Sequence, residues 1–391
     1  MQIDLLSPAS FAHGQPHDQF DWLRENDPVH WHDEPEGPGF WAVTRHVDVK
    51  AIGRDAATFS SNPTIMIPDE AGGPDLGDHH MMITTDPPLH GTYRRLASPD
   101  FVPRAARALQ PRIDELAGVI VDQVAARGEC DLVEDLAGLM PSYVIAEMLG
   151  IPHEDGVALY KLTEAIHSAP ESQAPGAGML AVVEMFNYAS GVFQEKKANP
   201  TDDLSSRLIA SLDDIDFNLF FLLLIDAGGD TTRNLVAGGM QALFDHPNQL
   251  ARLQADIDGL LPSAIEEMLR WVSPVIYMRR TAMRDAELRG RSITKGDKVV
   301  MYYGAANRDR DAFDGADQFD VGRSPNDHVA FGGGGPHFCL GAHIGRLEIA
   351  AMLRQILTRL PDMQPAGDAE WLPSNFISGP KHLPVSFTPS R

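Results

Sequence analysis

The chain has 391 residues, of which 43% are hydrophobic and 22% are charged, a composition typical of a soluble globular protein. Its formal net charge of −23 argues against nucleic acid as the main partner, because nothing offsets repulsion from phosphates. The two cysteines, Cys130 and Cys339, exclude a disulfide scaffold and suit a reducing cytosol. We therefore expect a cytoplasmic protein.

Two further features argue against a membrane anchor. The first twenty residues contain no basic region followed by an apolar stretch, so no signal peptide is expected. The longest apolar run, 217–225, is far too short to span a bilayer.

The first half of the chain alternates short strand-like and helical patterns. Strands are expected at 28–32 and 39–44, and a helix at 47–54. Residues 60–88 are rich in Pro, Gly and Asp and predict a long loop, which we interpret as a binding lid. Amphipathic helices are expected at 105–127 and 134–150, followed by a loose stretch at 167–178.

The second half begins with a long apolar helix at about 217–244. An irregular region follows, with a strand-like segment at 298–303, and then a glycine-rich loop and helix at 332–360. No linker separates two compositional halves, so one domain over 1–391 is predicted, mainly α with a minor β part.

The segment FGGGGPHFCLG (331–341) combines four consecutive glycines with one of the two cysteines. A phosphate-binding loop is excluded, because no lysine follows and the G-x-G-x-x-G spacing is absent. A structural turn with a buried cysteine is the ordinary alternative. However, a helical pattern follows directly, so Cys339 would sit at a helix N-terminus, where a thiolate is favoured. The glycines would let a flat, bulky group approach the backbone, as a thiolate ligand to haem iron requires.

This segment resembles the cysteine-ligand loop of the cytochrome P-450 superfamily, in its soluble bacterial class. The resemblance implies haem b, with Cys339 as the axial iron ligand and His337 beside a propionate. It also implies that Phe331 and Gly341 contact the cofactor. Gly332 stands where the usual loop has Phe, so this loop is one residue longer, as in bacterial members that act on sterols and branched lipids.

A second motif, IDAGGDTTRN (225–234), lies within the long apolar helix. Its glycines are poor helix formers, which is consistent with a tolerated irregularity or with a local opening for dioxygen. It resembles the family's oxygen-binding groove. The resemblance implies that Asp230 and Thr231 deliver protons and that Ala227 and Gly228 lie against the haem. The haem is expected between this helix and the helix after Cys339.

Two further motifs resemble the same family. In DPPLHGTYRRL (86–96), His90 and Arg94 would face one haem propionate, and Arg280, rather than its neighbour Arg279, would bind a propionate too. In EMLR (267–270), Glu267 and Arg270 are three residues apart, which alone is typical of a surface ion pair. The resemblance instead implies a buried structural network completed by Arg323.

The implied function is a haem-thiolate monooxygenase that hydroxylates a hydrophobic terpenoid, steroid or fatty-acid-like molecule with O₂. No flavin or nicotinamide motif is visible, so a ferredoxin and its reductase are expected to supply electrons to a monomeric enzyme. Four arginines on the cysteine side form either a docking patch for that ferredoxin or scattered surface positions: Arg104, Arg107, Arg112 and Arg346.

Substrate contacts are expected from the lid, from residues near 165–185, and from the long helix, the region near Val275 and the C-terminal tail. The expected residues are Ile65, Met66, Met82, Ile83, Leu223, Asp226, Val275, Ile276, Phe376 and Ile377. Asp226 is unusual because it is acidic. It is expected either to face water or join the proton network, or to bond a polar group of the substrate.

Two other functions are compatible with the same fold. A peroxide-driven peroxygenase generally lacks the acid–alcohol pair, so Asp230 and Thr231 argue against it. The same pair argues against a non-catalytic haem-binding sensor.

Overall fold

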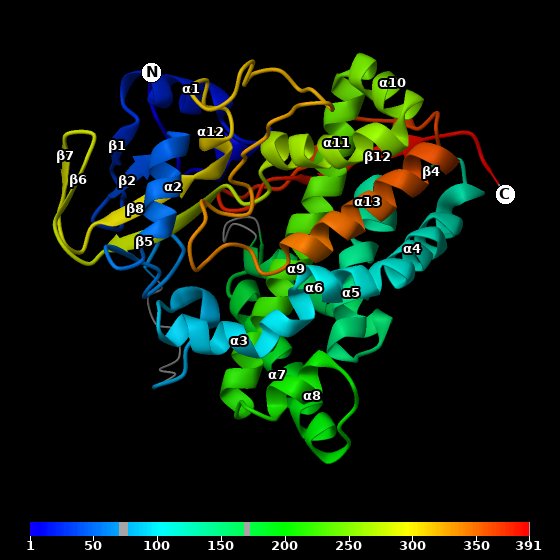
Figure 1. Cartoon of the computed structure of the whole chain (residues 1–391), viewed down its shortest axis with the longest axis horizontal. Helices are drawn as coiled ribbons and strands as arrows, with labels where there is room; N and C mark the ends of the chain where they lie inside the picture. Colours follow the sequence, from blue (N-terminus) through cyan, green and yellow to red (C-terminus); the bar gives the residue numbers. More distant parts are fainter. Residues whose placement is uncertain (70–76, 168–172, 391) are drawn as a thin grey trace.

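The computed structural model describes residues 1–69, 77–167 and 173–390. A β-rich part contains the N-terminus and a larger helical part surrounds the long helix α9 (Figure 1). The helices are α1 (His17–Asn26), α2 (His46–Arg54), α3 (Leu89–Phe101), α4 (Pro103–Ala125), α5 (Leu139–Leu149), α6 (His153–His167), α7 (Ala177–Ala198), α8 (Leu204–Ile209), α9 (Asp214–Asp245), α10 (Pro247–Ala255), α11 (Ile257–Val272), α12 (Tyr303–Ala306) and α13 (Ala342–Arg359). Short 3₁₀ turns occur at Pro8–Phe11 and Met82–Thr84, and a π-helical turn at Val133–Ala137.

The main sheet has the strand order β1-β2-β8-β5-β3, with β2 and β8 parallel and the other pairs antiparallel. Its strands are β1 (Val29–His32), β2 (Phe40–Val43), β3 (Phe59–Ser60), β5 (Tyr277–Ala282) and β8 (Lys298–Tyr302). The smaller sheets use β4 (Glu129–Asp131), β6 (Ala286–Leu288), β7 (Arg291–Ile293), β9 (Gln364–Pro365), β10 (Glu370–Trp371), β11 (Pro380–His382) and β12 (Pro384–Ser386).

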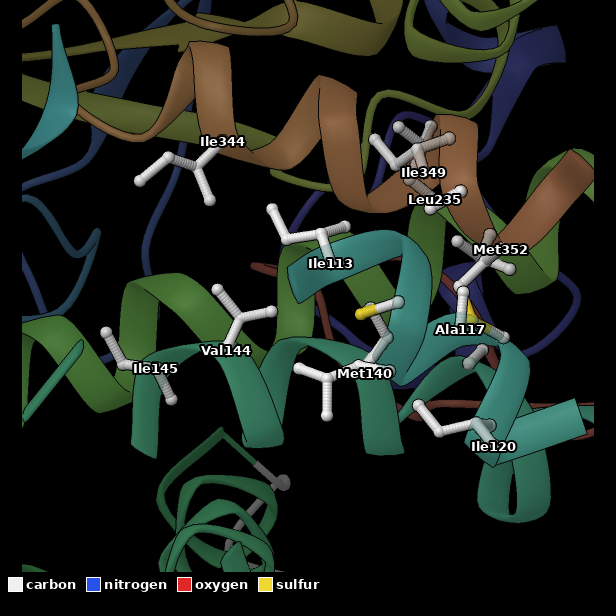
Figure 2. Packing of buried hydrophobic residues seen from close by; sticks show 14 of the residues in the cluster. Ile113, Ala117, Ile120, Met140, Val144, Ile145, Leu235, Ile344, Ile349 and Met352 are labelled. Atoms are coloured by element: carbon white, nitrogen blue, oxygen red, sulfur yellow. The ribbon is translucent and has the colours of Figure 1, made fainter. Parts of the chain in front are cut away.

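The core of the helical part is built around α9, whose apolar residues are buried on nearly every side. A helix in that position must be hydrophobic all round, which explains its long apolar run. Figure 2 shows Ile113 of α4, Met140 of α5, Leu235 of α9 and Met352 of α13 converging in this core. The packing fixes α9 and α13 relative to each other, and the candidate site lies between them.

Most predicted elements are confirmed. The strands at 28–32 and 39–44 and the helices at 105–127, 217–244 and 342–360 agree with β1, β2, α4, α9 and α13. The helix predicted at 134–150 is divided into the π-helical turn and α5, and it ends at Gly150 with φ +68° as a glycine C-cap. The structure corrects one expectation, because α9 is a continuous α-helix and no local opening occurs at 225–234.

Among the described residues, no helix is both long and apolar enough to cross a membrane.

Candidate active site

A largely apolar cavity lies between α9, the start of α13 and the loop that precedes it. Its apolar walls come from α5, α9, α11, the loop before α3 and the region around β5. The lining includes Met82, Ile83, Phe101, Ile145, Leu223, Leu224, Leu235, Leu269, Val275, Met278, Phe331 and Ile349. Polar groups are concentrated at one side of the cavity, where the cysteine and several basic side chains meet.

Cys339 lies just before α13 begins; it is accessible from this cavity, although the surrounding protein encloses it. Its backbone N–H donates to the carbonyl of Phe331 at 3.0 Å, which closes the loop. Burial raises the pKa of the Cys339 thiol, whereas the backbone N–H groups of Gly341 and Ala342 and two nearby arginines act in the opposite direction. The sulfur therefore has amide donors that can stabilise a thiolate ligand.

The glycines before Cys339 serve mainly to pack this loop against α2. A Cβ at Gly333 would lie 2.7 Å from the carbonyl oxygen of Val49, and a Cβ at Gly335 would collide with the carbonyl of Gly53. Of the four glycines, only Gly332 borders the cavity. The sequence-based interpretation, that the glycines make room for a flat ligand, is therefore corrected for Gly333–Gly335.

The extra loop residue leaves Phe331 at the cavity wall, with the guanidinium carbon of Arg346 4.5 Å from the centre of its ring. The loop insertion thus does not remove the aromatic side chain from the region of Cys339.

Basic side chains from three separate segments converge on the same side of the cavity. His90 of α3 packs against His337 with ring centres 4.2 Å apart, and Arg94 donates to the carbonyls of Pro336 and Phe338. Arg280 of β5 is 4% exposed, and its side chain donates to the carbonyl of Arg279 at 2.8 Å.

Among the described residues, neither Arg94 nor Arg280 forms an ion pair with a carboxylate, although both border the cavity. Burial lowers the pKa of Arg280. Burial and the nearby Arg280 also lower the pKa of His337 to about 3. A buried guanidinium without a counter-charge, such as that of Arg280, is costly, so this side of the cavity fits a ligand with its own carboxylates. Together with Cys339, the residues fit a haem.

Arg279 points elsewhere, because its Nη1 donates to Asp69 at 2.6 Å and to carbonyls near Ile67. Arg280 therefore borders the cavity and Arg279 does not, and the propionate contact predicted for Arg280 stays a prediction.

The face of α9 toward the cavity carries residues at helical spacing, including Leu224, Gly228, Thr231 and Leu235. The Thr231 hydroxyl donates to the carbonyl of Ala227 at 3.1 Å, and Ala227 itself borders the cavity. Gly229 is needed for another reason, since a Cβ there would lie 2.8 Å from the Tyr160 ring.

Asp230 lies on the opposite face of α9, toward α6. It is 2% exposed, and burial raises the pKa of its carboxyl group. Its Oδ1 has no hydrogen-bond partner among the described residues and lies 3.7 Å from Nη2 of Arg233. The acid and the alcohol of the predicted pair are therefore adjacent in sequence, with Thr231 at the main cavity and Asp230 behind it.

The predicted substrate contacts divide into two groups. Met82, Ile83, Leu223 and Val275 border the cavity. The other residues lie outside it: Ile276, Phe376, Ile377, Ile65 and Met66 pack in a separate hydrophobic cluster beneath the sheet. Asp226 also lies outside the cavity wall, and Nε2 of His167 contacts its Oδ1 at 2.6 Å. The region at 165–185 is mostly helical where it is described, and 168–172 lie outside the described residues.

Sequence reasoning missed two polar groups, one half-buried and one buried. His167, at the end of α6, pairs with Asp226, 59 residues away. Glu348 of α13 is 5% exposed and contacts Thr232. The helical spacing from Cys339 could have indicated a buried face for Glu348, but nothing near His167 in the sequence signals its partner. The predicted structural trio Glu267, Arg270 and Arg323 forms one buried network away from the cavity.

A mainly helical fold, a cysteine before α13, and cations around an apolar cavity that have no carboxylate partner in the described part of the chain are the features of a haem-thiolate protein. The comparisons give the family. The family model described as Cytochrome P450 matches residues 9–370, and the chain belongs to the cytochrome P450 family. Its fold is the cytochrome P450 fold, and the protein is a monooxygenase, an oxidoreductase with a haem-thiolate cofactor.

Three relatives illustrate the similarity. The chain is 36% identical to a methyl-branched lipid omega-hydroxylase of Mycobacterium tuberculosis, over 94% of this chain and 90% of the relative. It is 34% identical to a steroid C26-monooxygenase of Mycolicibacterium smegmatis, over 99% and 94%. The solved structure of a Mycobacterium marinum cytochrome P450 in complex with pseudoionone superposes with a TM-score of 0.93, at 37% identity and 99% coverage of both chains.

Proposed function

We propose that this enzyme hydroxylates a branched or polycyclic hydrophobic molecule, such as a methyl-branched lipid, a steroid or a terpenoid. The observation that carries the proposal is the composition of the cavity wall, in which apolar side chains such as Leu223, Val275 and Met278 line the same cavity as the cysteine. Such a wall favours binding of apolar substrates through burial of their surface. The names of the relatives, a lipid hydroxylase and a steroid monooxygenase, support the same substrate class.

The bound cofactor, proposed to be haem b, supplies the chemistry that splits O₂ and inserts one oxygen atom into a C–H bond. The chain contributes position and protons. Cys339 would hold the iron, and the backbone N–H groups of Gly341 and Ala342 act on its sulfur. The basic residues at the cavity would bind the carboxylates of the haem: Arg94, Arg280, His90 and His337. Phe331, Ala227 and Gly228 would line the same site.

Proton delivery is assigned to the acid–alcohol pair. The Thr231 hydroxyl, which donates to the Ala227 carbonyl, borders the main cavity and would donate a proton into it. Asp230 then restores the proton to Thr231. Both residues are held on one continuous helix, which keeps the acid and the alcohol at neighbouring positions.

The electrons are proposed to come from a ferredoxin and its reductase. Of the four arginines on the cysteine side, Arg112 is engaged with Glu147 and Glu115, and Arg346 with Glu266. Arg104 and Arg107 are exposed on α4, and no ion pair is recorded for either among the described residues. These two form the smaller patch through which an acidic partner would dock. We further propose that the protein is a cytoplasmic monomer.

The test is a substrate screen on the purified haem protein. Addition of branched lipids, steroids and terpenes should shift the haem spin state, and positive compounds should gain one ¹⁸O atom from ¹⁸O₂ with ferredoxin, reductase and NAD(P)H. Product formation with hydrogen peroxide alone would instead support a peroxygenase. Binding without turnover under either condition would support a sensor. A CO-bound reduced spectrum without a thiolate-type Soret band would overturn the assignment of Cys339.

A further inference from the structure

A second, much smaller cavity lies behind α9, on the side facing α6. It is bordered by Glu164 and His167 of α6, Asp230 and Arg233 of α9, and the C-terminal segment 372–377. About 10 Å³ of it is open to the centres of water-sized molecules, which is room for one water. A water there needs several polar partners, and charged side chains from two helices supply them.

Two polar atoms among these side chains lack a hydrogen bond within the described residues. These are Oδ1 of Asp230 and Nη2 of Arg233, both on residues that are at most 2% exposed. They lie 3.7 Å apart, too far for a hydrogen bond to each other. Buried polar atoms are almost always paired with protein or ordered water, so the small cavity is the natural place for their missing partner.

The His167–Asp226 pair lies at the outer side of the same cavity. The reactive atoms of His167, Asp226 and Asp230 all lie within 4.8 Å of one another. One water that makes two hydrogen bonds of about 2.8 Å at a tetrahedral angle spans about 4.6 Å between its partners. The spacing therefore suits a bridge by one water. His167 and Asp226 keep side-chain exposures of 13% and 24%, so this pair can exchange protons with solvent, whereas Asp230 cannot.

We propose that the His167–Asp226 pair is the outer donor of a proton path to Asp230, linked to it by a single ordered water in the small cavity. The inference rests on the proposed function, because it supplies the protons that Asp230 and Thr231 consume. In each step the bridging water takes a proton from the pair and gives one to Oδ1 of Asp230. The pair is then a carboxylate beside a neutral imidazole, and it recovers a proton from solvent.

The charged surroundings fit this role. Toward His167, α9 presents Asp226, Asp230 and Arg233, α6 presents Glu164 and Tyr160, and the C-terminal segment contributes the hydroxyl of Ser374 and the ring of Phe376. Burial opposes the charge on His167, but attraction and hydrogen bonding to Asp226, with a contribution from Asp230, raise its pKa to about 9. The donor therefore carries its proton at neutral pH.

Arg233 fixes the position of Asp230, the inner residue of the proposed proton path. Its Nη1 donates to Glu164, and its guanidinium lies 5.1 Å from the centre of the Tyr160 ring. Since these contacts fix the cation beside Asp230, the carboxyl group cannot rotate freely away from the cavity.

The test compares His167→Gln with His153→Gln. His153 begins the same helix and makes a similar contact, 2.9 Å from Nε2 to Oε1 of Glu147, but lies outside the cavity. Both variants should retain the CO-bound spectrum of the parent. His167→Gln should form at least threefold less product per NAD(P)H consumed, with the remainder appearing as hydrogen peroxide, whereas His153→Gln should match the parent. An equal yield of product per NAD(P)H in all three proteins would overturn the relay.

Asp226→Asn tests the relay through the pH dependence of coupling, the product formed per NAD(P)H consumed. A purely structural role of Asp226 would leave that pH dependence unchanged. The parent should lose coupling as the pH rises through about 9. In Asp226→Asn this loss should move down by at least one pH unit, because the imidazolium loses its counter-ion. The imidazole of His167 should show the same shift by ¹⁵N NMR of the reduced, CO-bound protein. An unshifted titration would contradict the proposal.

A crystal structure adds a direct check: one ordered water between Asp230 and the His167–Asp226 pair supports the path, and a metal ion at that place overturns it. Failure of the parent enzyme to oxidise any lipid, steroid or terpene with ferredoxin would count against the proposed function. Product formation that is insensitive to His167→Gln would count against the relay alone.

Discussion

Nε and Nη2 of Arg270 donate to the two carboxylate oxygens of Glu267 at 2.7 Å, and neither side chain is exposed to solvent. Nε of Arg323 donates to the same carboxylate at 2.9 Å, and Arg270 also donates to the carbonyls of Asn307 and Ala316. The network ties α11 to the irregular segment that leads into the cysteine loop. It therefore supports the position of Cys339 without touching the cavity.

Replacing Glu267 by Gln should destabilise the protein strongly. The change leaves the buried Arg270 guanidinium without its counter-charge, which typically costs about 3–5 kcal/mol in the free energy of unfolding. Chemical denaturation of the haem protein measures the difference. Arg354→Gln is the control, because Arg354 and Asp258 form an exposed pair and its loss should cost less than about 1 kcal/mol. Similar losses in both variants would contradict the argument from burial.

Gly335→Ala and Gly118→Ala should change stability in opposite directions. Gly335 has φ +78°, and a Cβ would collide with the carbonyl of Gly53, so alanine should destabilise by at least about 2 kcal/mol. Gly118 lies within α4 and has open space where a Cβ would go, so alanine there should stabilise by about 0.5–1 kcal/mol.

Thermal unfolding of the two glycine variants beside the parent gives both signs in one experiment. Loss of stability in Gly335→Ala should be accompanied by a weakened CO-bound thiolate band, because the loop positions Cys339. A neutral Gly335→Ala would show that the loop does not depend on its contact with α2.

Arg280→Gln should weaken haem retention. Arg280 faces the cavity without a carboxylate partner among the described residues, so its charge is free to bind a propionate. A charge-assisted hydrogen bond contributes about 1.5–3 kcal/mol, so haem should dissociate at least tenfold faster. Haem transfer to an excess of apomyoglobin measures the rate. Arg284→Gln is the control, since Arg284 is exposed and its side chain donates to the Thr58 hydroxyl and to no carboxylate among the described residues. Equal rates for both variants would remove Arg280 from the haem site.

Much of the architecture could be predicted because it depends on local patterns. The apolar run of α9 indicated a buried helix, and Gly150 indicated where α5 ends. By contrast, β5 was missed, since YMRRTA carries two consecutive arginines and becomes a strand only through pairing with β8. Its two arginines alternate sides, which places Arg280 at the cavity and Arg279 against Asp69.

Residues that belong to a motif could be placed at the cavity from the sequence. Residues could not be placed where only the direction of the side chain decides whether it reaches the cavity. Cys339, Thr231 and Arg280 all border one cavity as expected. Ile276 follows Val275, which borders the main cavity, and Phe376 precedes Ile377, which borders the small cavity. Both nevertheless pack in the hydrophobic cluster that includes residues of the sheet. The partner of Asp226 lies on another helix, so only the folded chain reveals that its charge is paired.

Glu348→Gln should stabilise the protein at pH 8 and have little effect at pH 5. Burial raises the pKa of Glu348 to about 7, although the Thr232 hydroxyl acts in the opposite direction. The folded state therefore binds more protons than the unfolded state between about pH 4.5 and 7, and this group's contribution to stability falls as pH rises through that window. The full penalty is about 3 kcal/mol, and it is present above pH 7. Gln keeps the shape and a hydrogen bond without the charge. Urea unfolding of parent and variant at both pH values measures the difference, and a stability difference that does not change with pH would contradict a buried, titrating Glu348.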